Sequence, residues 1–217
     1  MQNSSENDPF ATARQRLVCE QLSEFPPRVV AAMGRVPRHE FIPPEHQKFA
    51  YADSAVPIGF GQTISQPWIV ATMTTQLNPQ PADRILEIGT GSGYQAAVLA
   101  QLVAEVYTVE ILEPLAQRAG EMLRRLGCPN VHLRLGDGHG GWPEAAPFDG
   151  VIVTCAPEAV PAPLLAQLKD GGRMLIPVGP PSEQDLIVFQ KHRGCLLELT
   201  RVPVRFVPMT GQAATAP

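Results

Sequence analysis

Short apolar runs alternate with helix-like stretches after residue 83, and this alternation constrains the fold more than any other feature. The runs at 84–88, 105–110, 131–135 and 150–154 have the length and composition of strands. The stretch 114–127 between two of these runs carries an apolar stripe with helical spacing and stops at a glycine. Strands joined by helices pair in parallel. We therefore expect an α/β protein with a Rossmann-like, doubly wound sheet that is covered on both faces.

The last third of the chain departs from this alternation. A strand is expected at 173–178, after a short helix and a Gly-Gly pair. Two more β-like stretches, 186–190 and 196–206, follow without an obvious helix between them. This pattern predicts a late antiparallel strand in a mostly parallel sheet.

The N-terminal part is expected to be a helical extension of that core. Helices are predicted at 10–22 and 26–34, and frequent prolines then indicate an irregular segment that is too apolar to be a linker. A further helix begins at Pro67. The chain is therefore divided into a flexible tail at 1–9, the extension at 10–66, one core at 67–211 and a second flexible tail at 212–217.

Composition excludes some classes of protein. The formal net charge is −4, from 17 basic and 21 acidic residues without a basic stripe, so nothing supports a grip on nucleic acid, although an RNA substrate is not excluded. No apolar run is long enough to span a membrane, and the N-terminus lacks the features of a secretory signal. The four cysteines and five histidines are scattered without metal-ligand spacing. We expect a cytoplasmic monomer without a metal.

A glycine-rich loop, Glu87-Ile-Gly-Thr-Gly-Ser-Gly93, follows the first strand of the core and opens a helix. Such a loop lets the backbone approach a ligand closely. A phosphate-binding P-loop would need Gly-Lys-Ser/Thr, and no lysine is present. A dinucleotide fingerprint would need a small residue where Tyr94 stands. A tight strand–helix turn without a ligand remains an alternative for Gly89, Gly91 and Gly93.

Three acids at the ends of three successive strands favour S-adenosylmethionine as the ligand, with S-adenosylhomocysteine as the product. Glu87 would repel a pyrophosphate but suits an ammonium and a sulfonium, and Glu110 can accept from both ribose hydroxyls. Asp137 is expected to accept from the adenine amino group, with Gly138 admitting the ring. Separately, each could be a solvated acid, a helix-dipole charge or a turn residue. The predicted cofactor-binding residues are Glu87, Gly89, Thr90, Gly91, Gly93, Glu110, Asp137 and Gly138.

Several further segments carry a resemblance that covers the chain from about Leu17 to Gly211. They are Arg35-Val-Pro-Arg38, Pro57-Ile-Gly-Phe-Gly-Gln-Thr-Ile-Ser-Gln-Pro67, Leu86-Glu-Ile-Gly-Thr-Gly-Ser-Gly-Tyr-Gln95, LKDGGRMLIPVG at 168–179 and VRFVPMTG at 204–211. With these segments the chain resembles the protein-L-isoaspartate (D-aspartate) O-methyltransferases, which are class I S-adenosylmethionine-dependent enzymes. The resemblance implies methylation of the free α-carboxyl of L-isoaspartyl residues in damaged proteins, which starts their repair through a succinimide.

The resemblance also implies roles for residues outside the glycine loop. Ser65 matches the family's active-site serine, Thr63 and Ile64 lie beside the bound peptide, and Val207, Pro208 and Met209 belong to the substrate site. The family's typical residue at position 209 is leucine, and methionine conserves the volume. From the residues alone, Ser65 could instead cap the helix that begins at Pro67. A methyltransferase acting on a small molecule or RNA, and a non-catalytic binding protein, remain the alternative functions.

Overall fold

The computed structural model describes residues 9–214. The predicted tails at 1–9 and 212–217 fall mostly outside the described residues. The chain forms a seven-stranded sheet in the order β5-β4-β3-β6-β7-β8-β9, together with a separate two-stranded hairpin. The strands of the large sheet are β3 (Arg84–Ile88), β4 (Glu105–Glu110), β5 (Val131–Leu135), β6 (Phe148–Val153), β7 (Leu168–Val178), β8 (Gln184–His192) and β9 (Cys195–Val204).

Parallel pairing in this sheet runs from β5 through β4, β3 and β6 to β7. The strands β8 and β9 then pair antiparallel, each with its predecessor. The mostly parallel sheet with a late antiparallel strand is therefore confirmed. It forms because β3 and β6 present apolar side chains to both faces, as strands covered on two sides require.

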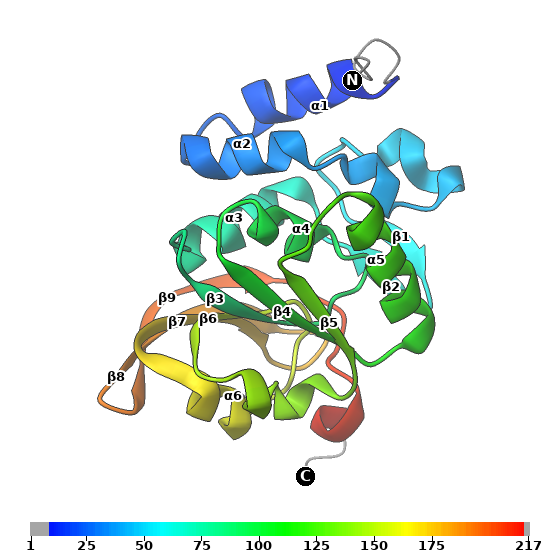
Figure 1. Cartoon of the computed structure of the whole chain (residues 1–217). Coiled ribbons are helices and arrows are strands. Elements are labelled where there is room, and N and C mark those ends of the chain that lie inside the picture. Colours follow the sequence, from blue (N-terminus) through cyan, green and yellow to red (C-terminus); the bar gives the residue numbers. More distant parts are fainter. Residues whose placement is uncertain (1–8, 215–217) are drawn as a thin grey trace.

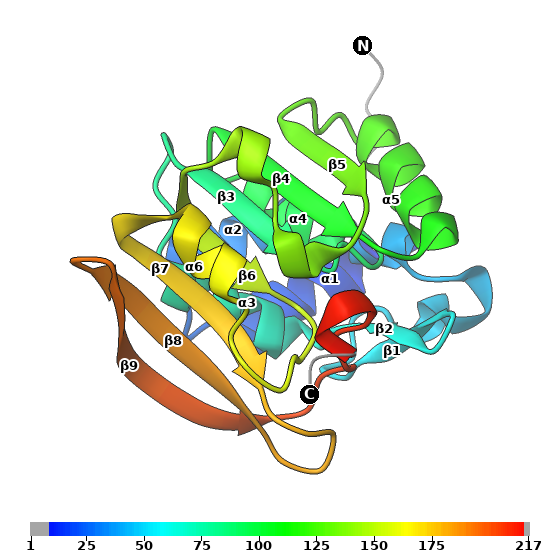
Figure 2. The same ribbon diagram turned by 90° about the horizontal axis from the view of Figure 1, so that it is seen from below.

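Helices cover the two faces of the sheet unequally (Figures 1 and 2). Helices α3, α4 and α5 pack on one face, whereas α6 lies on the other. Alternate residues of one strand serve the two cores: Ile85 packs with the first group of helices, and Leu86 packs with Leu164 of α6. The helix bounds are α1 (Ala11–Arg16), η1 (Leu17–Gln21), α2 (Pro27–Arg35), α3 (Pro67–Leu77), α4 (Tyr94–Ala100), α5 (Glu113–Arg125) and α6 (Ala162–Gln167).

The N-terminal extension lies over the α3–α4 face and shares its core (Figure 1). Leu17 and Val29 are completely buried there. The helix expected at 10–22 divides into α1 and a single π-helical stretch, η1. Because these buried residues belong to the same cluster as Ile85, the extension packs as part of the core.

The segment expected to be irregular contains more structure than its prolines suggest. It holds the hairpin β1 (Val56–Gly59) and β2 (Gln62–Ile64), whose turn has positive φ at Gly59, Phe60 and Gly61. Strands this short carry too few residues to show alternation, which is why the sequence did not reveal them. The remaining short helices are 3₁₀ helices: η2 (Arg38–Phe41), η3 (Pro44–Phe49), η4 (Gly138–Gly140), η5 (Pro143–Ala145) and η6 (Gly211–Ala214).

Candidate active site

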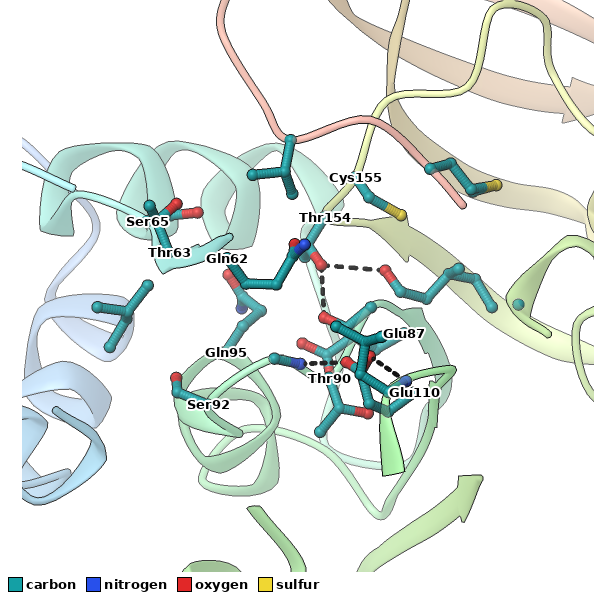
Figure 3. A pocket seen from close by; sticks show the side chains of 18 of the residues that line it. Gln62, Thr63, Ser65, Glu87, Thr90, Ser92, Gln95, Glu110, Thr154 and Cys155 are labelled. Atoms are coloured by element: carbon teal, nitrogen blue, oxygen red, sulfur yellow. Dashed lines mark hydrogen bonds between the residues drawn. The ribbon is translucent and has the colours of Figure 1, made fainter. Parts of the chain in front are cut away.

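A cleft opens at the carboxyl ends of β3 and β4, where the strand order reverses: the chain runs from β3 outward to β4 and β5, and then returns to form β6 on the other side of β3. Open α/β sheets bind ligands at such a switch point. Figure 3 shows Ser65 and Thr63 together on one side of the cleft, and Glu87, Thr90 and Glu110 gathered on the other. Predicted site residues that line it are Thr63, Ile64, Ser65, Glu87, Gly89, Thr90, Gly91, Glu110, Gly138, Val207, Pro208 and Met209.

The first two glycines of the loop are required by its geometry. Gly89 has φ 92°, and a Cβ there would lie 2.7 Å from Thr154 Oγ1. Thr154 Oγ1 donates to the carbonyl oxygens of Ile88 (3.0 Å) and Gly89 (2.6 Å), which fastens the loop to the end of β6. Gly91 has φ 54° and faces the cleft. The backbone is thus held open to a ligand at both positions.

The third glycine has a different role. Gly93 does not line the cleft; a Cβ at this position would approach Ala119 Cβ of α5 to 3.3 Å. Its φ is 90°, a value that favours glycine. The structure therefore explains Gly93 by the close packing of the α4 start against α5. Its predicted contact with a cofactor stays a prediction.

Glu87 is completely buried at the end of β3. Thr108 Oγ1 donates to Glu87 Oε2 at 2.5 Å, whereas Glu87 Oε1 is buried without a hydrogen-bond partner among the described residues. The pKa of Glu87 is raised to about 8: burial raises it most, the Thr108 hydrogen bond lowers it, and the nearby Glu110 carboxylate raises it. A cationic ligand group would offset this burial and satisfy the remaining oxygen.

Glu110 at the end of β4 stabilises the loop from the other side. Its Oε2 accepts from the Gly91 backbone N–H at 2.7 Å, and its Oε1 accepts from the Leu112 N–H at 3.0 Å. Each carboxylate oxygen can accept a second hydrogen bond. Glu110 can therefore hold the loop and still accept from a ligand's hydroxyl groups, as was predicted for the ribose.

Asp137 and Gly138 separate in the structure. Gly138 lines the cleft, and a Cβ there would collide with Ile88, so only glycine fits. Asp137 is absent from the cleft lining: its Oδ1 accepts from the His139 N–H (2.9 Å) and its Oδ2 from the Gln212 N–H (2.8 Å). In this arrangement Asp137 ties the C-terminal segment to the end of β5. Its predicted hydrogen bond to an adenine stays a prediction.

The acceptor side of the cleft is built by β2 and the start of α3. Thr63 is exposed, Ile64 is buried and Ser65 is half-buried. The helix N-terminus is capped from elsewhere, because Asp53 Oδ1 accepts from the Trp68 N–H at 2.9 Å. The Ser65 carbonyl accepts from Arg38 Nη2 at 2.7 Å, while its hydroxyl has no hydrogen bond within residues 9–214. The hydroxyl is thus available to a ligand, and the capping alternative is not what the structure shows.

The C-terminal segment closes the cleft beside Cys155. The Ala156 N–H donates to the Val207 carbonyl, and the Met209 N–H donates to the Ala156 carbonyl, both at 2.8 Å. These bonds form a parallel bridge between Ala156 and Pro208. Residues 207–209 are thereby fixed as a wall of the same cleft, although they lie far from the glycine loop in the sequence.

Sequence reasoning missed several residues of the cleft. Thr154 is the last residue of a predicted strand and Cys155 follows it, and both reach the same sheet edge as Glu87, so their place at a strand end is a usable signal. Ile111 is an exposed apolar residue directly after Glu110, which is a usable signal. Gln62, Ser92 and Gln95 also line the cleft, but no spacing in the sequence distinguishes them. Among residues 9–214, no group of His, Cys, Asp or Glu could hold a metal. No helix of the described part is long and apolar enough to cross a membrane.

Comparisons with known proteins identify the family of the chain. The family model described as protein-L-isoaspartate(D-aspartate) O-methyltransferase matches residues 14–214. A relative from Syntrophobacter fumaroxidans, named protein-L-isoaspartate O-methyltransferase 2, is 49% identical over 94% of this chain and 89% of its own length. A relative from Opitutus terrae, named protein-L-isoaspartate O-methyltransferase, is 53% identical over 91% of this chain and 86% of its own length.

Two solved structures share the fold of this chain. A protein-L-isoaspartate O-methyltransferase superposes with a TM-score of 0.84 at 29% identity, covering 92% of this chain and 67% of the other. A protein from Plasmodium falciparum, described under the same activity and in complex with S-adenosyl-L-homocysteine, superposes with a TM-score of 0.81 at 22% identity, covering 94% and 99%. With the family model matching nearly the whole chain, the chain belongs to the protein-L-isoaspartate(D-aspartate) O-methyltransferase family.

Proposed function

We propose that this protein transfers a methyl group from S-adenosylmethionine to the free α-carboxyl of L-isoaspartyl residues in damaged proteins and peptides. The ester then closes to a succinimide, whose hydrolysis returns part of the residues to normal aspartate. One observation carries the proposal: all the residues predicted to bind the acceptor, and all those predicted to bind the donor except Gly93 and Asp137, line a single cleft. We assign the acceptor side chiefly to the extension at 10–66 and the donor side to the core at 67–211.

The donor side fits the chemistry of S-adenosylmethionine, which supplies a methyl group activated by a sulfonium. Glu87 offers a buried oxygen without a partner, which suits an ammonium. Glu110 keeps acceptor capacity for ribose hydroxyls, and Gly138 provides a surface without a side chain for a flat ring. The complex of the Plasmodium falciparum relative with S-adenosyl-L-homocysteine supports the same assignment. Thr90 and the backbone at Gly89 and Gly91 would complete this side.

The acceptor side has to position a nucleophile that is already ionised. A carboxylate needs no base above about pH 5, so the protein has to orient it and remove part of its water. The Ser65 hydroxyl can donate to one carboxylate oxygen, and Arg38 holds the Ser65 backbone in place. We assign the peptide chain itself to Thr63 and Ile64 on one side. Val207, Pro208 and Met209 would contact it on the other side.

We further propose that the protein acts as a cytoplasmic monomer on protein substrates rather than on nucleic acid. All the residues assigned to the cleft come from one chain, so no second copy is needed to complete it. The four cysteines are free, which is typical of a reducing compartment. The acidic net charge favours protein substrates over nucleic acid.

Two peptides that differ only in L-isoaspartate against L-aspartate test the activity. Methyl transfer from labelled S-adenosylmethionine is expected only to the isoaspartyl peptide, and equal rates on both would refute the repair assignment. Ser65→Ala should lower kcat/KM for the peptide by at least tenfold while the Kd for S-adenosylhomocysteine stays nearly unchanged. Ser23→Ala, at an exposed serine that does not line the cleft, is the matched control.

A further inference from the structure

Thr108 is a buried hydroxyl residue that lies behind the cleft. It is completely buried in β4, where it pairs in register with Glu87 of β3. Its Oγ1 donates to Glu87 Oε2 at 2.5 Å and lies 2.6 Å from Thr90 Oγ1. Thr90 and Glu87 line the cleft, whereas Thr108 does not. Any effect of Thr108 on a ligand must therefore pass through these two residues.

The direction of this hydrogen-bonded chain follows from the number of protons. A threonine hydroxyl has one proton, and an ionised carboxylate can only accept. When Glu87 is ionised, the Thr108 proton goes to Glu87, so the proton between the two threonines must come from Thr90. The chain then runs from the glycine loop through Thr108 to Glu87 Oε2. Oxygen Oε1 remains buried and without a partner among the described residues.

Packing alone does not account for a threonine at this position. The neighbouring buried residues of the strand are Val106 and Val109, and valine has the shape of threonine without its hydroxyl. A buried hydroxyl is unfavourable unless it is hydrogen-bonded. Here both of its hydrogen bonds lead to residues that line the cleft. The hydroxyl therefore contributes to the orientation of the Glu87 carboxylate.

We infer that Thr108 is a positioning residue for donor binding: it fixes the Glu87 carboxylate so that Oε1 is left for the cationic end of S-adenosylmethionine, and it links that carboxylate to Thr90 in the loop. The inference rests on the proposed function, because it assumes that the donor binds beside Glu87. It assigns to Thr108 no contact with the donor or with the isoaspartyl peptide.

The first test compares binding of S-adenosylhomocysteine by calorimetry to the wild type and to three variants. Thr108→Val should weaken binding on the order of tenfold, as expected for a hydrogen bond to a charged group, and Thr108→Ser should restore it to within about twofold. Thr75→Val is the control, since its buried hydroxyl has no partner among the described residues and lies outside the cleft. It should leave the Kd unchanged.

Steady-state kinetics and melting separate a positioning role from a structural one. For Thr108→Val, the KM for S-adenosylmethionine should rise, while kcat and the KM for the isoaspartyl peptide should stay within about twofold. A lower Tm with an unchanged Kd would mean that Thr108 only stabilises the fold, and the inference would be wrong. Should this variant not fold, Thr90→Val breaks the same chain at its loop end, and an unchanged Kd there would overturn the inference.

A double-mutant cycle tests whether Thr108 acts through Glu87. In the Glu87→Gln background, Thr108→Val should change the Kd less than twofold, because the charged acceptor is gone. A tenfold effect in both backgrounds would refute the coupling. A wild-type protein that does not bind S-adenosylhomocysteine would remove the proposed function together with this inference. If the wild type binds S-adenosylhomocysteine and Thr108→Val binds it equally tightly, only the inference about Thr108 is wrong.

Discussion

Glu87→Gln in the free protein tests the electrostatics of the cleft most directly. The substitution keeps the size and shape of the side chain but removes its ability to ionise. The group that it replaces is completely buried, accepts one hydrogen bond, from Thr108, and lies near the Glu110 carboxylate. The charged form of Glu87 is therefore unfavourable in the folded protein without a ligand. In the unfolded chain the same carboxyl is surrounded by water and ionises freely.

The sign and size of the effect follow from the pKa of Glu87. Folding raises this pKa from 4.5 to about 8, so the folded protein keeps a proton that the unfolded chain loses. The contribution to stability is fully present below pH 4.5 and is lost as the pH rises through about 8. Each unit of pKa difference corresponds to about 1.4 kcal/mol. The free energy of unfolding should therefore fall by on the order of 5 kcal/mol across this window because of Glu87 alone.

Urea unfolding of the free protein at several pH values between 5 and 9 measures this contribution. The stability of Glu87→Gln relative to the wild type should increase with pH and level off above about pH 8. Glu45→Gln, which removes an exposed carboxyl outside the cleft, is the control for the loss of one acid. If the wild-type and Glu87→Gln curves run parallel across this range, Glu87 is already ionised in the free protein and the reasoning is refuted.

Three further results are expected. S-adenosylmethionine should bind more tightly as the pH rises toward 8, because its cationic end stabilises the ionised form of Glu87, which burial and the Glu110 carboxylate disfavour in the free protein. Calorimetry in buffers with different ionisation enthalpies should detect the proton that Glu87 releases on binding, and pH-independent binding would contradict this. Gly89→Ala should destabilise the protein by about 1–3 kcal/mol and abolish measurable donor binding, since φ is positive and the new Cβ would meet Thr154; an unchanged melting curve and Kd would contradict it. Arg38→Met should lower the stability by about 3 kcal/mol and lower kcat/KM for the isoaspartyl peptide, because the guanidinium donates to the carbonyl groups of Ala50 and Ser65. A Tm and a kcat/KM equal to those of the wild type would refute that role.

The sequence predicted the central sheet well because its strands are buried on both faces. Such strands appear as continuous apolar runs, and the acids and glycines that follow them mark one edge of the sheet. The hairpin β1–β2 was not predicted, since its strands are short and depend on a distant contact: Arg118 Nη2 donates to the Ile58 carbonyl at 2.6 Å.

Long-range partners also explain what the sequence could not show of the cleft. The strand-end position of Asp137 is as predicted, but its carboxylate accepts a hydrogen bond from the Gln212 N–H, which lies 75 residues further along the chain. The helix cap that Ser65 could have supplied comes instead from Asp53. Strand ends are thus readable from local sequence, whereas the partner of a polar group at a strand end depends on where distant segments pack.

The bridge between Ala156 and Pro208 has a consequence for synthesis of the protein. The glycine loop and its acids precede residue 111, whereas residues 207–210 complete the wall beside Cys155. A growing chain of 200 residues therefore already contains every residue that is assigned to the donor. Every such chain lacks the last wall against which a damaged peptide would lie. Residues 207–210 must therefore be synthesised before this protein can repair another.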